Sequence, residues 1–122
     1  MSQSIINDLK KNVIAFVDEL IEQFPQETDL VFGRILLKDQ MPAQKIMDNF
    51  VSKILPYKAQ ILAKDDDFFL KNSTSLFGGN NQRVNHLKVI WKSSRLDEED
   101  RAIIWDWFKT FVYLCEKYLK EL

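Results

Sequence analysis

This chain of 122 residues contains few of the residues that interrupt helices or hold small disulfide-bonded folds together. It has three glycines, three prolines and one cysteine. One cysteine excludes an internal disulfide, which fits a reducing compartment. The composition is 46% apolar with 12% aromatic residues, which argues against disorder and leaves room for long helices. A chain of this length typically forms one domain, so we expect a single helical domain across residues 1–122.

A surplus of charge of one sign is also lacking. Seventeen basic and 18 acidic side chains give a net charge of −1, so bulk attraction to nucleic acid or to an anionic membrane is not expected. Long hydrophobic runs are absent as well. Asn7, Asp8, Lys10 and Lys11 interrupt the N-terminal segment, and residues 102–122 carry six charged side chains. We therefore expect an intracellular protein without a signal peptide or a transmembrane segment.

Two helices are predicted in the first third of the chain. Apolar residues from Ser4 to Phe24 follow helical three-and-four spacing, and Pro25 ends this helix because the residue before a proline avoids helical angles. A second, short helix is expected after Thr28 and through residues 29–38. The Thr28 hydroxyl is predicted to cap its first amides.

Two or three further helices are predicted in the middle of the chain. Pro42 suits a first helical turn, and Pro56 stops or kinks the helix that follows it. This helix is expected to bury a stripe made of Ile46, Phe50, Val51, Ile54 and Leu55. Another turn or two is expected in residues 57–63, and a short amphipathic helix in residues 80–92.

The last helix has the clearest start. Asp97 is placed to cap it, and the acids at 98–100 suit the positive end of the helix dipole. Its apolar face is predicted to contain Ile104, Phe108, Phe111, Cys115, Tyr118 and Leu122. The sequence therefore predicts an all-α fold, a compact bundle of five or six helices with a long C-terminal core helix.

The segment 64–81, KDDDFFLKNSTSLFGGNN, has two interpretations. Asp65–Asp67 resemble a metal site only in composition, because calcium loops place their acids at alternate positions. The acids are better explained as facing water or capping a short turn, with at least one phenylalanine anchoring the segment. Gly78–Gly79 precede a predicted helix start but lack the Gly-x-x-x-x-Gly-Lys pattern, so a turn is favoured over a phosphate site.

Candidate catalytic residues are few. His86 is the only histidine and cannot join a zinc site of several histidines, and Cys115 is expected to be a buried, inert thiol. No catalytic residues, metal ligands, cofactor or small-molecule substrate are therefore predicted. An enzyme with an unfamiliar site remains the third hypothesis, and a deep pocket lined by convergent polar groups would favour it.

A basic stretch supplies the alternative function. Arg83, Lys88, Lys92 and Arg95 occur without an intervening acid, and the last three can share one helix face. Such a face can contact phosphates, which makes a nucleic-acid-binding accessory protein the runner-up. A solvated helix face is the simpler explanation, and the acids at 97–100 would repel a polyanion.

The aromatic residues also allow two interpretations. Aromatic residues at helical spacing usually belong to a core, yet tryptophan is favoured at binding hot spots. Trp105 and Trp107 are two residues apart and cannot share a narrow helix face, so one of them is a candidate interface residue. We predict a non-enzymatic interaction or structural protein that binds a protein partner or self-associates through its last helix. The predicted interface residues are Trp107, Phe111 and Tyr118.

Residues 64–70, KDDDFFL, followed by residues 87–114, LKVIWKSSRLDEEDRAIIWDWFKTFVYL, carry a family resemblance. The pattern resembles small uncharacterised helical proteins of nucleocytoplasmic large DNA viruses, in which an acidic-aromatic stretch precedes a tryptophan helix and an Ile-Trp pair. Ile104–Trp105 matches that pair, and the similarity covers about 50 residues. It implies a viral protein in the cytoplasm of an infected cell or in a virion, with Trp91 and Trp105 as structural residues, and it supplies no catalytic residues.

Overall fold

The computed structural model describes residues 2–68 and 97–122, and within these ranges every regular element is helical. The predicted all-α fold is confirmed, with five α-helices in the described ranges. In chain order the elements are α1 (Ser2–Gln23), α2 (Thr28–Ile35), the π-helical turn η1 (Leu36–Gln40), α3 (Ala43–Lys53), the 3-10 turn η2 (Leu55–Tyr57), α4 (Lys58–Leu62) and α7 (Glu98–Lys120). The helix expected in residues 80–92 lies outside the described residues.

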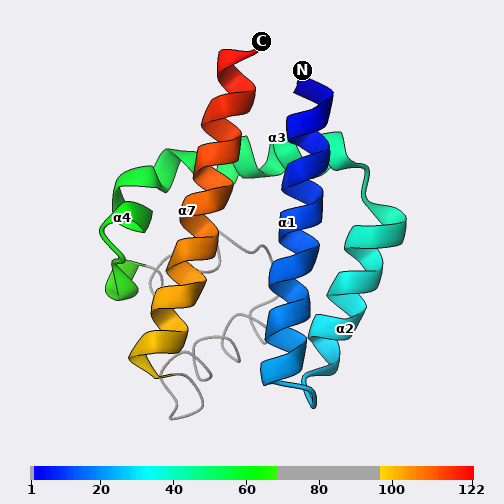
Figure 1. The fold of residues 1–122 in the computed structure, drawn as a ribbon, viewed down its shortest axis with the longest axis vertical. Coiled ribbons are helices and arrows are strands. Elements are labelled where there is room, and N and C mark those ends of the chain that lie inside the picture. The colour runs from blue at the N-terminus through cyan, green and yellow to red at the C-terminus, as the bar shows by residue number, and fades with distance from the viewer. Residues whose placement is uncertain (1, 69–96) are drawn as a thin grey trace.

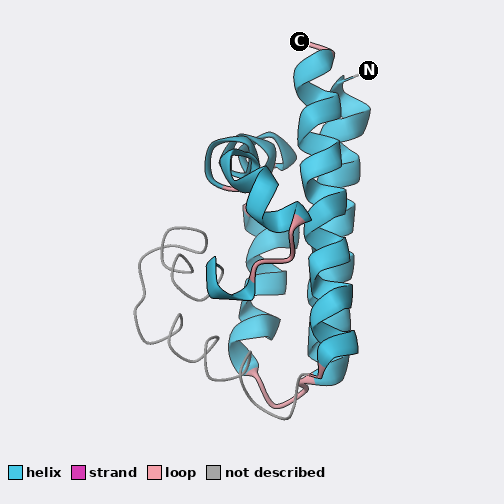
Figure 2. Ribbon diagram, turned by 90° about the vertical axis from the view of Figure 1, so that its left-hand side faces the viewer, coloured by secondary structure: helices cyan, strands magenta, loops and turns pink. Residues whose placement is uncertain are grey.

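The two long helices, α1 and α7, form the centre of the fold (Figure 1). They lie side by side and run in opposite directions, so both ends of the chain lie at the same end of the molecule. The α2 helix packs beside α1, and α4 packs beside α7. The α3 helix crosses behind the α1–α7 pair and contacts both of its members (Figure 2).

The core contains much of the predicted apolar stripes, although Phe50, Val51 and Leu55 of the predicted middle stripe are only partly buried. In residues 2–68 and 97–122 the buried apolar side chains are Ile5, Ile6, Leu9, Val13, Phe24, Ile46, Met47, Ile54, Ile61, Ile104, Trp105, Phe108, Phe111, Val112, Cys115 and Tyr118. Seven of these sixteen belong to α7, which confirms the prediction of a long C-terminal core helix. Leu122 was placed on the same face, but it follows the helix end and is 76% exposed, so that assignment is wrong.

Phe111 lies at the centre of an aromatic cluster that joins three helices. Its ring centroid is 5.8 Å from that of Phe16 on α1, 5.4 Å from that of Phe50 on α3, and 5.8 Å from that of Phe108 on its own helix. All three contacts have edge-to-face geometry, which favours aromatic pairs beyond the area they bury. The cluster fixes the spacing of α1, α3 and α7.

The start of α7 is capped as predicted. The backbone N–H of Asp100 donates to Asp97 Oδ1 at 2.8 Å, and the backbone N–H of Asp97 donates to Asp100 Oδ2 at 3.3 Å. This reciprocal capping box satisfies two amides that the helix leaves without partners. The prediction for Thr28 is wrong: Glu27 holds the cap position of α2, Thr28 is the first helical residue, and no side chain caps this helix.

The α4 helix ends at Leu62, and Lys64 follows as the one described non-glycine residue with a positive φ, at 55°. The N–H of Asp65 donates to the carbonyl of Gln60, and the N–H of Lys64 to that of Ile61. These two bonds form a Schellman motif, in which glycine normally occupies the left-handed position. Asp65 then begins the next helical turn, because its Oδ1 accepts from the backbone N–H of Phe68 at 2.9 Å.

Replacing Lys64 with glycine is expected to raise the free energy of unfolding by about 0.5–1 kcal/mol, because glycine adopts this backbone conformation without strain. Lys64→Ala is the control, since it removes the charge but keeps the β-carbon that causes the strain. Urea unfolding of both variants checks the prediction. Equal stability of the glycine and alanine variants would show that Lys64 is not strained.

Candidate interaction surface

Two of the three acids at 65–67 have structural roles, and the third, Asp67, is exposed. Asp65 caps a helical turn, and Asp66 Oδ1 accepts a 3.0 Å hydrogen bond from the indole Nε1 of the buried Trp105. Phe68 anchors the same segment, with its ring centroid 4.9 Å from that of Tyr57. In the described ranges no three His, Cys, Asp or Glu side chains are grouped to hold a metal ion. The prediction is confirmed for Asp65, which caps a turn, for the exposed Asp67 and for the anchoring Phe68, whereas the hydrogen bond of Asp66 to Trp105 was not predicted.

Cys115 is a core residue with no exposed surface. Burial, together with the negative charge of Glu116, raises the pKa of its thiol from 9.0 to about 12. The thiol therefore stays protonated at neutral pH, and only the thiolate is an effective nucleophile. The expected burial of this cysteine is confirmed.

The three residues predicted to form an interface have contacts within the chain. Phe111 is 1% exposed, and Tyr118 is 9% exposed with its hydroxyl accepting from Gln44 Nε2 at 3.1 Å. Trp107 is half-buried and donates from Nε1 to Glu19 Oε2 at 2.8 Å. Phe111 and Tyr118 thus add almost nothing to the surface that a partner could contact.

The basic residues of the alternative function, Arg83, Lys88, Lys92 and Arg95, lie outside the described residues, as do Gly78–Gly79, His86 and Trp91. Binding of nucleic acid by these residues stays a prediction. Gel shifts at increasing salt test it. Binding that weakens steeply with salt and disappears when the four become glutamine would support it.

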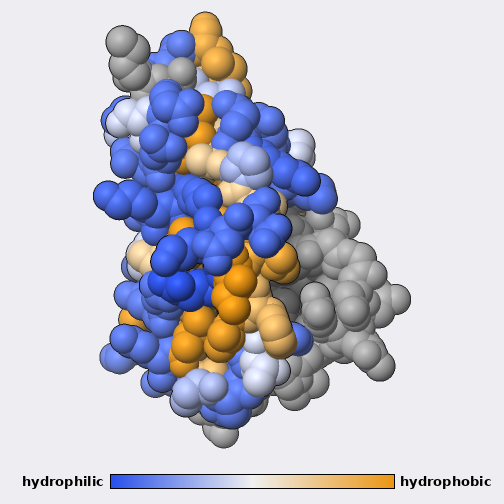
Figure 3. All heavy atoms as spheres, turned by 90° about the vertical axis from the view of Figure 1, so that its right-hand side faces the viewer, coloured by the Kyte–Doolittle hydropathy of each residue, from blue (hydrophilic) through white to orange (hydrophobic). Residues whose placement is uncertain are grey.

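Among the residues that the structure describes, the most apolar exposed surface lies on α2 and η1. Four large side chains share one side of this segment: Val31 (41% exposed), Phe32 (66%), Ile35 (46%) and Leu36 (52%). We name these four residues the α2–η1 face. Figure 3 shows an apolar band on the side of the molecule that carries α2. No residue of α2 or η1 is fully buried, which is unusual for a helix rich in large apolar residues.

The orientation of this face follows from what holds the opposite side. Leu30 and Leu37 pack against the core, and the Arg34 guanidinium pairs with Asp18 of α1. These three positions lie on the far side of the helix from Phe32 and Leu36, because successive residues turn by about 100°. Anchoring the segment to α1 therefore points the α2–η1 face outward.

A π-helical turn ends the segment. The N–H of Met41 donates to the carbonyl of Leu36 at 3.0 Å, five residues earlier. The Lys10 ammonium of α1 donates to the carbonyl of Met41 at 2.8 Å and to that of Lys38 at 3.3 Å. Short π-helical turns are rare and occur frequently at functional sites. The turn thus adds support for a functional role of the adjoining face.

Other exposed large apolar residues in the described ranges are scattered. Leu62 lies on α4, and Ile103, Tyr113 and Leu119 point to different sides of α7. Sequence reasoning missed the α2–η1 face although a signal was present. Residues 30–37 place large apolar side chains on both sides of a short helix, and packing on one neighbour covers only one side.

Comparison with protein-family models, curated proteins and solved structures gives no significant match. The resemblance of the second half to viral helical proteins therefore stays a prediction. None of the helices in the described part of the chain is both long and apolar enough to span a bilayer.

Proposed function

We propose that this protein is a non-enzymatic interaction protein that self-associates through the α2–η1 face. The observation that carries this proposal is the outward side of α2, where four large apolar side chains lie together, each 41–66% exposed. Contiguous exposed apolar surface of this kind is typical of interaction sites, whereas singly scattered apolar residues need no explanation. The setting that the viral resemblance implies, an infected cell or a virion, is part of the proposal.

A second copy of this chain is the partner that fits best. An isologous dimer places the same face on both sides of the contact, and an apolar face is complementary to itself. Charge does not oppose the pairing, because residues 28–40 carry two acids, Asp29 and Asp39, and two bases, Arg34 and Lys38. The Arg34 charge is also paired with Asp18 within the chain.

The exposed apolar area of the α2–η1 face sets the expected strength of the dimer. Complete burial of a large apolar side chain contributes about 1.5–3 kcal/mol, and about half of each of these four remains exposed. Covering the exposed parts on two copies contributes roughly 6–12 kcal/mol. Association itself costs about 4–15 kcal/mol. We therefore expect a weak dimer with a micromolar or weaker Kd.

The average mass from light scattering, measured from about 10 µM to about 500 µM protein, tests the proposal. The wild type is expected to approach the dimer mass as concentration rises. The double variant Phe32→Glu/Leu36→Glu is expected to stay monomeric, because it places charges in a contact that must exclude water. Its free energy of unfolding should change little, because both side chains are exposed in the monomer.

The matched control is Tyr113→Glu/Leu119→Glu. These two α7 side chains are 55% and 42% exposed, and they lie outside the α2–η1 face. This control is expected to dimerise like the wild type. A wild type that stays monomeric at the highest concentration would contradict self-association, and equal loss of dimer in both double variants would contradict the choice of surface.

A further inference from the structure

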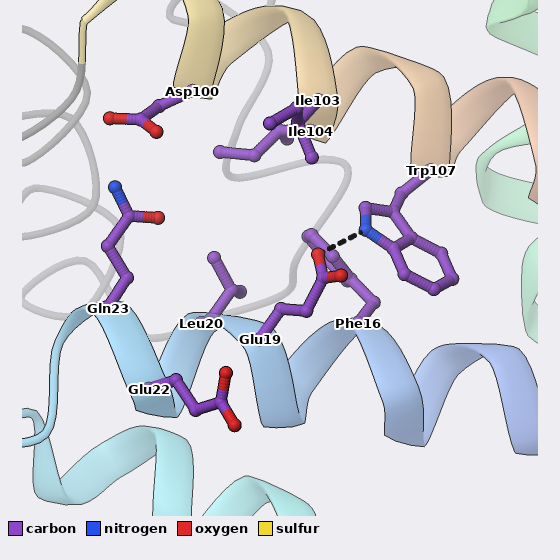
Figure 4. A pocket seen from close by; sticks show the side chains of 9 residues that line it. All are labelled: Phe16, Glu19, Leu20, Glu22, Gln23, Asp100, Ile103, Ile104 and Trp107. Atoms are coloured by element: carbon purple, nitrogen blue, oxygen red, sulfur yellow. Dashed lines mark hydrogen bonds between the residues drawn. The ribbon is translucent and has the colours of Figure 1, made fainter.

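A groove lies between the second half of α1 and the first half of α7 (Figure 4). Its volume is about 410 Å³, within the range of sites that bind small ligands or anchoring side chains. Phe16 and Leu20 of α1 face Ile104 of α7 across it and form an apolar floor. Trp107 closes one end, and Ile103, which is 50% exposed, lies beside the floor.

The rim of this groove is acidic. Glu19, Glu22 and Asp100 line it, and no lysine or arginine is among the nine lining residues. In Figure 4 Glu19 reaches toward Trp107 and Gln23 faces Asp100, while the Glu22 side chain projects from the side of α1 that faces away from α7. Glu19 accepts from Trp107, and Asp100 belongs to the capping box of α7. A carboxylate can accept several hydrogen bonds, so both can also contact a cation at the rim.

An apolar floor beneath an acidic rim selects the chemistry of its occupant. An apolar side chain can enter between Leu20 and Ile104, while positive charges beside it remain hydrated at the level of Glu19 and Asp100. We propose that this groove binds a basic peptide segment in which large apolar side chains are flanked by lysines or arginines. The complementary charge favours such a peptide over an acidic or neutral one.

This site is separate from the α2–η1 face, because the two share no residue. Peptide binding by the monomeric Phe32→Glu/Leu36→Glu variant is therefore expected to equal that of the wild type. The two proposals can fail independently: loss of dimer leaves peptide binding intact, and loss of peptide binding leaves the dimer intact.

An NMR titration of the full chain tests the groove directly. The probe is the peptide Ac-AKLAKLAKA-NH2, and the signal is the indole N–H of Trp107, assigned by its disappearance in Trp107→Phe. We expect this signal to shift with peptide at low salt and the affinity to fall severalfold between about 50 and about 300 mM salt. Replacing the peptide's lysines with glutamate should abolish binding, and replacing its leucines with alanine should weaken it at least fivefold.

The variant Glu19→Gln/Gln23→Lys changes the rim by two charge units, and glutamine can still accept from the Trp107 indole. We expect peptide binding about tenfold weaker, from the loss of two exposed charge interactions. The control Asp8→Asn/Gln3→Lys makes equivalent changes at the far end of α1, where both residues are exposed. No shift of the Trp107 signal, equal binding of the alanine-substituted peptide, or equal weakening in both variants would overturn the proposal.

Discussion

Replacing Phe111 with alanine is expected to lower the free energy of unfolding by about 3–5 kcal/mol. The side chain is 1% exposed and contacts the rings of Phe16 on α1 and Phe50 on α3. Its removal leaves a cavity where three helices meet, and the long helices cannot close it without losing their other contacts. Urea unfolding followed by circular dichroism measures the loss, which is large for a domain of about 5–15 kcal/mol stability.

Tyr113→Ala is the matched control for this experiment. Tyr113 lies two residues away on the same helix but is 55% exposed, so its truncation is expected to change stability by less than about 0.5 kcal/mol. A loss below about 1 kcal/mol in Phe111→Ala would show that α7 does not form the centre of the core.

The second large effect is expected at Asp66. Its Oδ1 accepts from the indole N–H of Trp105, which is 3% exposed. Replacing Asp66 with alanine removes the acceptor of a buried N–H donor. We therefore expect the free energy of unfolding to fall by about 1–3 kcal/mol. The indole N–H signal of Trp105 in NMR spectra should shift at the same time.

Two neighbouring substitutions separate the hydrogen bond from the charge. Asp66→Asn keeps an acceptor oxygen and should retain most of the stability, whereas Asp67→Ala removes an exposed acid and should have little effect. Similar losses in Asp66→Ala and Asp67→Ala would contradict a specific role for the bond to Trp105. In that case the acids would affect stability only through their total negative charge.

The elements that depend on local physics were predictable. The capping box of α7 involves residues three apart, and its acids gave a clear signal in the sequence. Pro25 ended α1 as expected, because its effect on the preceding residue does not depend on the fold. The helical spacing of Ile104, Phe108 and Phe111 correctly identified buried residues, because one side of α7 faces the remaining helices.

The features that depend on tertiary packing were not predictable. Residues 30–37 carry apolar side chains all round, and only the contacts of Leu30, Leu37 and Arg34 with the rest of the fold decide which side faces outward. The π-helical turn depends on the packing of the segment in the same way, because the Lys10 ammonium of α1 donates to the carbonyls of Lys38 and Met41. The sequence therefore predicted the helix but not the exposed face.

The interface predicted on α7 differs from the exposed α2–η1 face for a similar reason. Aromatic residues such as Trp107, Phe111 and Tyr118 are favoured at contact surfaces, but they are equally favoured in a core. Their burial depends on how α1 and α3 pack against α7, and this arrangement is not encoded in the spacing within one helix. The groove likewise requires α1 and α7 to lie side by side, although residues 16–23 and 100–107 are far apart in the chain.

Disulfide trapping at the α2–η1 face tests the central claim most directly. In a Cys115→Ala background, a cysteine at Ile35 lies near the middle of the proposed symmetric contact, whereas a cysteine at Tyr113 lies on α7. Mild oxidation is expected to convert Ile35→Cys/Cys115→Ala to a disulfide-linked dimer and to leave Tyr113→Cys/Cys115→Ala largely monomeric. Equal yields of linked dimer from the two variants, or none from the Ile35 variant, would contradict self-association through this face.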